Sequence, residues 1–297
     1  MRVQPRAWIG LAVWVLYIVV IVVLQKTSGI GYTEFGDSPS NLWRGAVLSL
    51  VVGAVVLALV TTWLGWWRPA LRERRTTKAK WTVIAPALFV IALIGNLAGI
   101  TWSAATMDFI LAALALGVFV GFAEELTTRG LLLVGLRGSV AEVWAALISS
   151  LCFGLMHGIN IFLGQSVADT LPQVGQAFLL GLTFYILRRV TGSLVWAMVL
   201  HGAWDFSVFM IGEAGGSNPL GAVAPHRAAG ARLLLVRRPG RPRSVGRREP
   251  DPAAVTAEPS ASAARRRRLL AHIDICRCLS TVTSNISTTV DGTLRPA

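Results

Sequence analysis

The sequence predicts an all-α fold: a polytopic transmembrane helical bundle of about seven spans, followed by a disordered C-terminal tail. Of the 297 residues, 54% are hydrophobic and only 14% are charged. This balance is typical of a membrane protein rather than of a soluble domain. In addition, seven apolar stretches approach the roughly 20 residues that a helix needs to cross a bilayer.

The seven stretches follow one another from the N-terminus to about residue 211. They cover residues 7–24, 42–67, 81–100, 108–126 with a continuation towards 137 left open, 143–158, 172–187 and 194–211. The first one follows Arg2 and Arg6, as the apolar part of a signal peptide would. Because no small-residue cleavage site follows it, we expect a retained first span.

Positive charge orients the predicted bundle. Lys and Arg gather before the first stretch, in the linker 68–80, at Arg129 with Arg137, and at Arg188-Arg189, whereas the loops 29–40 and 101–106 carry few. Seven alternating crossings place all the basic regions on one side, so we interpret them as topology signals. We therefore expect a multi-pass integral protein of a bacterial cell membrane with a cytoplasmic N-terminus.

Most of the net charge of +13 belongs to the end of the chain. Residues 222–297 contain 14 Arg, no Lys and 5 acidic residues, and they show little apolar periodicity. We expect this tail to be disordered or the product of a frameshift, and we expect no nucleic-acid partner. The chain then divides into residues 1–107 with three spans, residues 108–211 as a catalytic core, and residues 222–297.

Three polar motifs lie in the apolar stretches of residues 108–211. An ionisable side chain in a bilayer costs roughly 2.5–3.5 kcal/mol on insertion scales, so carboxylates and imidazoles that recur in separate spans indicate a functional site. The motifs are Glu124-Glu125-x3-Arg129, Phe153-x3-His157 and His201-x3-Asp205. Two small-residue pairs, Gly117-x3-Gly121 and Gly154-x3-Gly158, fall where helices must approach closely.

Helical spacing allows the motifs to meet. If helices 108–137 and 141–158 form a hairpin that turns near residues 138–139, Glu124 and His157 lie about 22 and 27 Å from the turn. His201 lies about 12 Å beyond the next turn, at 191–193, with Asp205 one helical turn deeper on the same face. Glu125 can pair with the arginine four residues later, which leaves Glu124 pointing about 100° away towards the site.

The order and spacing of these motifs resemble the CAAX-processing endopeptidase and bacteriocin-processing enzyme family of intramembrane proteases, also called CPBP or Abi. The resemblance covers residues 108–211. It implies that Glu124 activates water, that His157 and His201 assist it or bind a metal, and that Asp205 takes the place of the family's final Asn or Asp beside the scissile carbonyl. It also implies that Glu125 and Arg129 hold the site together.

The predicted function is therefore an intramembrane endopeptidase that hydrolyses a peptide bond in a membrane-associated protein or peptide. A carboxylate can take a proton from the attacking water, and an imidazole or a metal can stabilise the oxyanion. Zinc is suited to His157, His201 and Glu124 with one open position, and metal-free catalysis by Glu and His is the alternative. The expected partners are membrane lipid and a peptide or membrane-protein substrate.

Two other classes of function stay open. The chain departs from the family at Thr127-Thr128, where apolar or aromatic residues are usual, and it has about seven spans rather than eight. Both departures would suit a catalytically silent membrane scaffold or a bacteriocin-immunity factor. A proton-coupled transporter could use Glu and His as a proton relay, but neither discontinuous helices nor inverted repeats are evident in the sequence.

Overall fold

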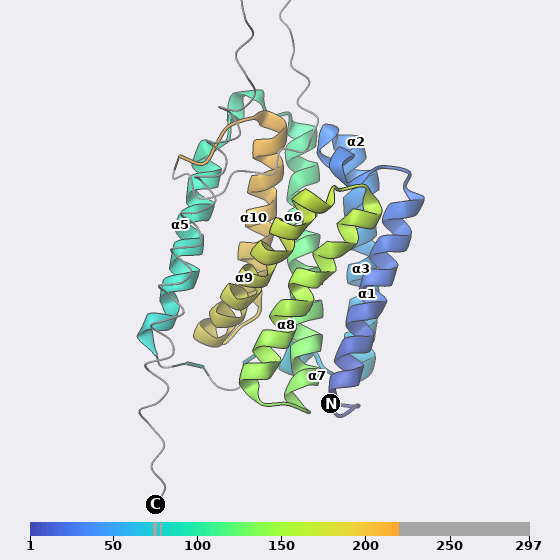
Figure 1. Cartoon of the computed structure of the whole chain (residues 1–297), viewed down its shortest axis with the longest axis vertical. Helices are drawn as coiled ribbons and strands as arrows, with labels where there is room; N and C mark the ends of the chain where they lie inside the picture. The colour runs from blue at the N-terminus through green and yellow to red at the C-terminus, as the bar shows by residue number, and fades with distance from the viewer. Residues whose placement is uncertain (74–75, 78, 220–297) are drawn as a thin grey trace, which may run out of the picture. The chain divides into compact units, whose positions relative to one another are not determined.

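Seven helices long and apolar enough to cross a membrane make up most of the described chain (Figure 1). The computed structural model describes residues 1–73, 76–77 and 79–219. The spans are Ala7–Thr27, Pro39–Leu64, Trp81–Gly99, Met107–Arg137, Glu142–Leu163, Val167–Thr191 and Val195–Ala214. No strand occurs among the described residues, so the all-α bundle of seven spans is confirmed there. The predicted tail, 222–297, lies outside them.

Several spans combine α-helix with short segments of other helical types. The elements are α1 (Ala7–Thr27), η1 (Tyr32–Asp37), α2 (Pro39–Asn41), η2 (Leu42–Val47), α3 (Leu48–Leu64), α4 (Trp67–Leu71), η3 (Lys80–Val83), α5 (Ile84–Gly99), η4 (Trp102–Ala104), α6 (Met107–Glu125), η5 (Leu126–Leu132), α7 (Leu133–Arg137), α8 (Glu142–Met156), η6 (His157–Leu163), α9 (Val167–Thr191) and α10 (Val195–Ala214). Segments η2 and η5 are π-helical, and the other η segments are 3-10 helices.

Helix α9 begins five residues before the predicted span at 172–187. The side chain of Ser166 accepts a hydrogen bond from the backbone N–H of Asp169 at 3.1 Å, which satisfies one of the unpaired donors at the start of the helix. Pro172 therefore lies within the helix rather than at its start. The helix continues past the predicted end of the span at 187 to Thr191. It stops at the turn expected near 191–193, where Gly192 has a φ of 75°, the left-handed conformation that glycine adopts without strain.

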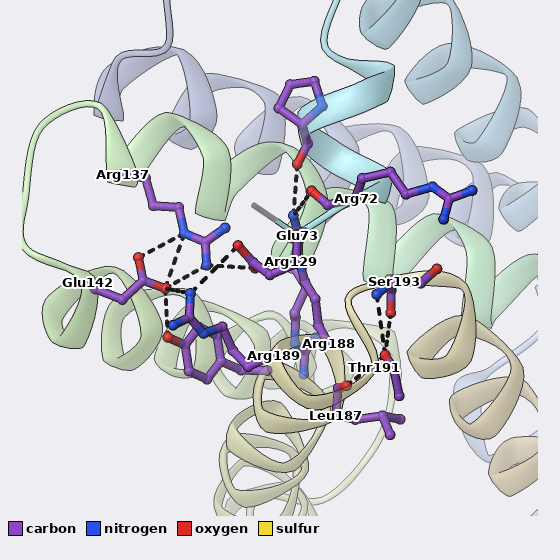
Figure 2. Close-up of polar contacts among 12 residues, drawn as sticks. Arg72, Glu73, Arg129, Arg137, Glu142, Leu187, Arg188, Arg189, Thr191 and Ser193 are labelled. Atoms are coloured by element: carbon purple, nitrogen blue, oxygen red, sulfur yellow. Dashed lines mark hydrogen bonds and ion pairs between the residues drawn. The ribbon is translucent and has the colours of Figure 1, made fainter. Parts of the chain in front are cut away.

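The predicted basic regions meet at one end of the bundle. The backbone N–H of Arg2 donates to the carbonyl of Leu64 at 3.1 Å, and Arg72 forms a β-bridge with Ser193. Glu73 forms ion pairs with Arg137 at 2.9 Å and with the arginines at the end of α9 (Figure 2). The arrangement agrees with the predicted alternation of the spans, and the direction in which this end faces stays a prediction.

The sequence predicts that Arg188 is a topology signal, but in the structure this residue also holds segments of the bundle together. This side chain is fully buried, and its guanidinium lies 3.3 Å from a Glu73 carboxylate oxygen. It also donates hydrogen bonds to the carbonyl of Pro69, at 2.7 Å, and to the carbonyl of Arg129 (Figure 2). Arg188 therefore connects three segments inside the bundle.

Glycines set the closest helix contact, which is between α6 and α10. A Cβ added to Gly117 would lie 2.5 Å from the carbonyl oxygen of Gly202, and one added to Gly121 would collide with the carbonyl of Met198. On α8, a Cβ at Gly154 would lie 2.8 Å from a backbone oxygen of α9. The expected close approach is therefore confirmed at these three glycines. It is wrong for Gly158, where an added Cβ would meet nothing within 4 Å.

The outward faces of the spans carry large apolar side chains. Leu59, Leu88, Val118 and Leu179 are each more than half exposed, although they lie on four different helices. A soluble domain rarely exposes so much apolar surface. These faces suit contact with lipid, which agrees with the membrane-spanning lengths of the helices.

Candidate active site

The first motif lies where helix α6 passes into the π-helical segment η5. Such segments occur often at functional sites. Leu126 to Leu132 are all buried, so the two threonines that depart from the family pattern need internal hydrogen-bond partners. Each hydroxyl donates to the carbonyl four residues earlier: Thr127 to Ala123 and Thr128 to Glu124, both at 2.7 Å. The departure at Thr127-Thr128 is thus accommodated without an unpaired hydroxyl.

Glu125 joins the first and third motifs. One of its carboxylate oxygens lies 3.1 Å from the Arg129 guanidinium, with both side chains fully buried, which confirms the predicted pair. The same oxygen lies 3.0 Å from Nδ1 of His201 on α10. Because a carboxylate can only accept, Nδ1 carries a hydrogen, and this contact fixes the orientation of the His201 ring. No helical spacing predicts the contact between Glu125 and His201, because the two residues lie on different helices.

Arg129 is held on several sides in this apolar interior. Its guanidinium carbon lies 3.8 Å from the centre of the Phe153 ring, so the aromatic residue of the second motif provides a cation–π contact. Its Nη1 donates to the Thr128 hydroxyl at 2.6 Å, and its Nε to the carbonyl of Gly181 on α9 at 3.4 Å. A buried charge needs such pairing and hydrogen bonding to offset its desolvation.

The His201 ring lies between aromatic side chains and two further carboxylates. It stacks on Phe184 of α9, with ring centres 5.1 Å apart, and its Nε2 faces away from Glu125. This nitrogen lies 3.9 Å from Oε2 of Glu124 and 3.8 Å from Oδ2 of Asp205. Both distances are too long for direct hydrogen bonds, but they suit groups bridged by a water molecule.

Glu124 differs from its neighbour Glu125 in its surroundings. Oε2 of each glutamate is buried and has no hydrogen-bond partner among the described residues, so the difference lies in exposure. The Glu124 side chain is nevertheless 14% exposed and that of Asp205 is 28% exposed, whereas Glu125 is fully enclosed. The two side chains beside Nε2 of His201 are therefore partly exposed, and the one beside Nδ1 is not.

His157 lies at the border of this cluster. Its Nδ1 is 2.9 Å from the carbonyl oxygen of Phe153 and must donate to it, which leaves Nε2 as the other ring nitrogen. Its ring and that of His201 both contact Phe153 edge-on, with centres 5.1 and 5.5 Å from the phenyl centre. The structure thus brings five of the six predicted site residues into direct contact or close approach, and His157 joins them across Phe153.

The side chains as placed do not form a zinc site. Zinc binds nitrogen and oxygen ligands at about 2.0–2.2 Å, usually with at least three protein ligands. Among the described residues, no three His, Cys, Asp or Glu side chains are grouped to hold a metal ion, and this includes the predicted set His157, His201 and Glu124. We derive no step through a metal, and zinc dependence stays a prediction.

Residues 106–207 match the family model described as type II CAAX prenyl endopeptidase Rce1-like. The matched region contains all three motifs and every predicted site residue, so it confirms the resemblance predicted from them. It covers about a third of the chain. No match was found among curated proteins or among solved structures. Seven apolar helices and a membrane protease family together indicate a multi-pass integral membrane protein.

Proposed function

We propose that this chain, Rce1-like over residues 106–207, is an intramembrane endopeptidase that hydrolyses a peptide bond near the C-terminus of a membrane-associated protein or peptide. One observation carries the proposal. Inside an apolar bundle, Oε2 of Glu124 has no hydrogen-bond partner among the described residues and lies 3.9 Å from Nε2 of His201, and the Glu124 side chain is 14% exposed. A bundle without chemistry has no reason to bury such a carboxylate.

In the proposed reaction, a water molecule binds between Glu124 and His201. Glu124 takes a proton from this water as its oxygen attacks the scissile carbonyl carbon. The tetrahedral intermediate then collapses, the C–N bond breaks, and the leaving nitrogen receives the proton. Because the two enzyme groups already face each other, the water is positioned before the substrate binds.

The other residues position these two groups. Glu125 holds Nδ1 of His201, and Arg129 neutralises Glu125, so the imidazole presents Nε2 to the water. We assign His157 to assisting the water or the oxyanion from across Phe153. Asp205 is the most exposed of the three carboxylates, which supports our assignment of this residue to a contact with the entering scissile peptide. These roles follow from the contacts together with the family resemblance.

The test is hydrolysis by the purified protein in detergent, with a panel of labelled peptides that includes one ending in farnesylated Cys-Val-Ile-Met. We expect Glu124→Gln to lower the rate by at least about 100-fold, because a general base contributes 10²–10⁴-fold. Glu142→Gln is the matched control, since Glu142 binds Arg137 at the end of the bundle formed by the basic regions. A Glu124→Gln enzyme with wild-type activity, or wild-type protein that cleaves no peptide, would overturn the proposal.

The same samples decide whether a metal takes part. If zinc is used, a chelator should abolish hydrolysis, added zinc should restore it, and His201→Ala should lose bound zinc by elemental analysis. If catalysis is metal-free, active preparations should contain far less than one metal ion per chain, and chelation should leave the rate unchanged.

A further inference from the structure

A row of polar side chains extends beyond the three motifs, starting in η6. A 3-10 helix has three residues per turn, so residues 157, 160 and 163 lie on one face. Asn160 is 5% exposed and Leu163 is 6% exposed, whereas Ile161 and Phe162 are 38% and 69% exposed. Asn160 therefore lies on the inward face, directly beyond His157.

Asn160 is hydrogen-bonded to residues from two distant segments. Its Nδ2 donates to Oε1 of Gln173 on α9 at 3.0 Å, and Nε2 of Gln173 donates to the hydroxyl of Tyr32 in η1 at 2.9 Å. Residues 32, 160 and 173 thus form one connected chain although they lie far apart in the sequence. We name this set the Tyr32 chain. These hydrogen bonds hold the three side chains in fixed positions relative to one another.

Helix α9 connects the Tyr32 chain to the catalytic cluster. Gln173 lies on the same side of α9 as Ala177, Gly181 and Phe184, at spacings of three or four residues. On this side, Gly181 accepts a hydrogen bond from Arg129 and Phe184 stacks on His201. Gln173 therefore lies about 12–17 Å further along the helix, a distance that an extended peptide covers in about four or five residues.

The environment of Tyr32 favours a neutral phenol. Burial, together with the charges of Asp205 and Glu124, raises its pKa to about 12, although hydrogen bonds with Gln173 and Asn160 act in the opposite direction. The hydroxyl consequently keeps its hydrogen at neutral pH. Its oxygen accepts from Gln173, and a phenol can accept and donate at the same time.

We propose that the Tyr32 chain binds the main chain of the peptide substrate, with the Tyr32 hydroxyl donating a hydrogen bond to a carbonyl oxygen. A donor selects an acceptor, and the acceptors of a peptide are its carbonyls and its terminal carboxylate. The negative charges of Glu124 and Asp205 repel the terminal carboxylate of the peptide, so a neutral carbonyl is the favoured ligand. This inference rests on the proposed peptidase function and deepens it.

Steady-state kinetics give the first test. Tyr32→Phe removes only the hydroxyl, and we expect KM to rise roughly 3–10-fold with kcat little changed, because one hydrogen bond that holds substrate and transition state equally is lost. Tyr185→Phe is the matched control. It removes a hydroxyl that donates to Glu142 at 2.6 Å, in the charged end of the bundle, and should leave KM unchanged. Equal KM values for wild type and Tyr32→Phe would overturn the proposal.

A binding measurement separates this inference from the proposed function. The probe is a fluorescein-labelled peptide ending in farnesylated Cys-Val-Ile-Met, bound to the Glu124→Gln variant with and without Tyr32→Phe. Tyr32→Phe should weaken binding roughly 3–10-fold. In a series of peptides that replace each amide in turn with a trans-alkene, one member should bind equally to both proteins, because it lacks the contacted carbonyl.

The outcomes are distinguishable. Tyr32-dependent binding to a protein that cleaves no peptide would uphold the binding site and overturn the peptidase proposal. If the protein cleaves peptide and Tyr32→Phe changes neither KM nor binding, the peptidase proposal is upheld and the binding site is overturned. A Tyr32→Phe effect that is equally large on every alkene analogue would show general damage to the fold and overturn the carbonyl contact. Thermal melting of both variants checks that the fold is retained.

Discussion

Two adjacent glutamates have opposite roles because the helix turns about 100° between them. Glu125 is fully buried and binds both Arg129 and His201, so we expect Glu125→Gln to leave a buried guanidinium without its charge partner. Breaking a buried pair in this way costs about 3–5 kcal/mol. The variant should melt at a clearly lower temperature in detergent and lose activity. Glu124→Gln should lose activity alone, and equal melting temperatures for the two variants would contradict this division of roles.

The sequence predicted this division of roles in part. The four-residue spacing of Glu125 and Arg129 is local, so helical geometry alone was enough to pair them. The contact between Glu125 and His201 joins residues 76 positions apart, and it depends on how closely α6 and α10 approach. The Tyr32 chain was missed for the same reason. Tyr32 lies in a short 3-10 helix between two spans, where no apolar periodicity marks its neighbours.

At the scale of the elements, helix α9 contacts the site through hydrogen bonds with Arg129 and through the ring of Phe184, which stacks on His201. Towards one end, Arg188 donates to the carbonyl of Arg129 and pairs with Glu73. We expect Arg188→Leu to destabilise the protein by at least about 2 kcal/mol, because it removes these bonds from a closed interior. Arg189→Leu is the matched control, since Arg189 is partly exposed and its ion pairs are longer, at 3.6 and 3.7 Å. Similar melting temperatures for both variants would show that Arg188 has no special structural role.

The contact between α6 and α10 sets the distance between the first and third motifs. A side chain at Gly121 would collide with the carbonyl of Met198, three residues before His201. We expect Gly121→Ala to force the helices apart, to cost about 1–3 kcal/mol and to lower kcat by moving His201 away from Glu124. Gly158→Ala, where an added Cβ meets nothing within 4 Å, should leave the melting temperature nearly unchanged. Thermal melting and hydrolysis rates of both variants test this difference.

The membrane-spanning helices are easier to predict from the sequence than the points where they begin, end or change helical type. All seven spans were located to within a few residues, because length and apolar composition suffice to identify them. The apolar pattern predicts a start of the sixth span at Pro172, but α9 begins at Val167, because the Ser166 side chain caps the helix by accepting from the N–H of Asp169. The π-helical turn of η5 and the burial of Arg188 had no local signal. Both depend on which helices surround the chain rather than on the chain itself.

At the scale of the whole molecule, polar contacts close the bundle at both ends. One end has the ion pairs around Glu73 (Figure 2). At the other, Asn218 follows the last span and donates to Oδ1 of Asn96 at 2.8 Å and to the carbonyl of Ala92 at 3.1 Å. Asn96 in turn donates to the hydroxyl of Ser207 at 3.1 Å. The segment just after α10 therefore ties α5 to α10.

Because of these contacts, we expect different effects from removing only the tail and from removing the segment just after α10 as well. Residues after Ala224 include no continuous apolar segment, so truncation there should leave insertion and melting temperature unchanged or improve expression. Truncation after Ala214 also removes Asn218 and the β-bridge from Gly216 to Ile100, and it should lower the melting temperature, because the buried Asn96 loses a hydrogen-bond donor. Protease protection and thermal melting of the two truncated proteins test the prediction. If truncation after Ala224 already abolishes insertion, the Arg-rich tail is a structural element and the frameshift hypothesis is wrong.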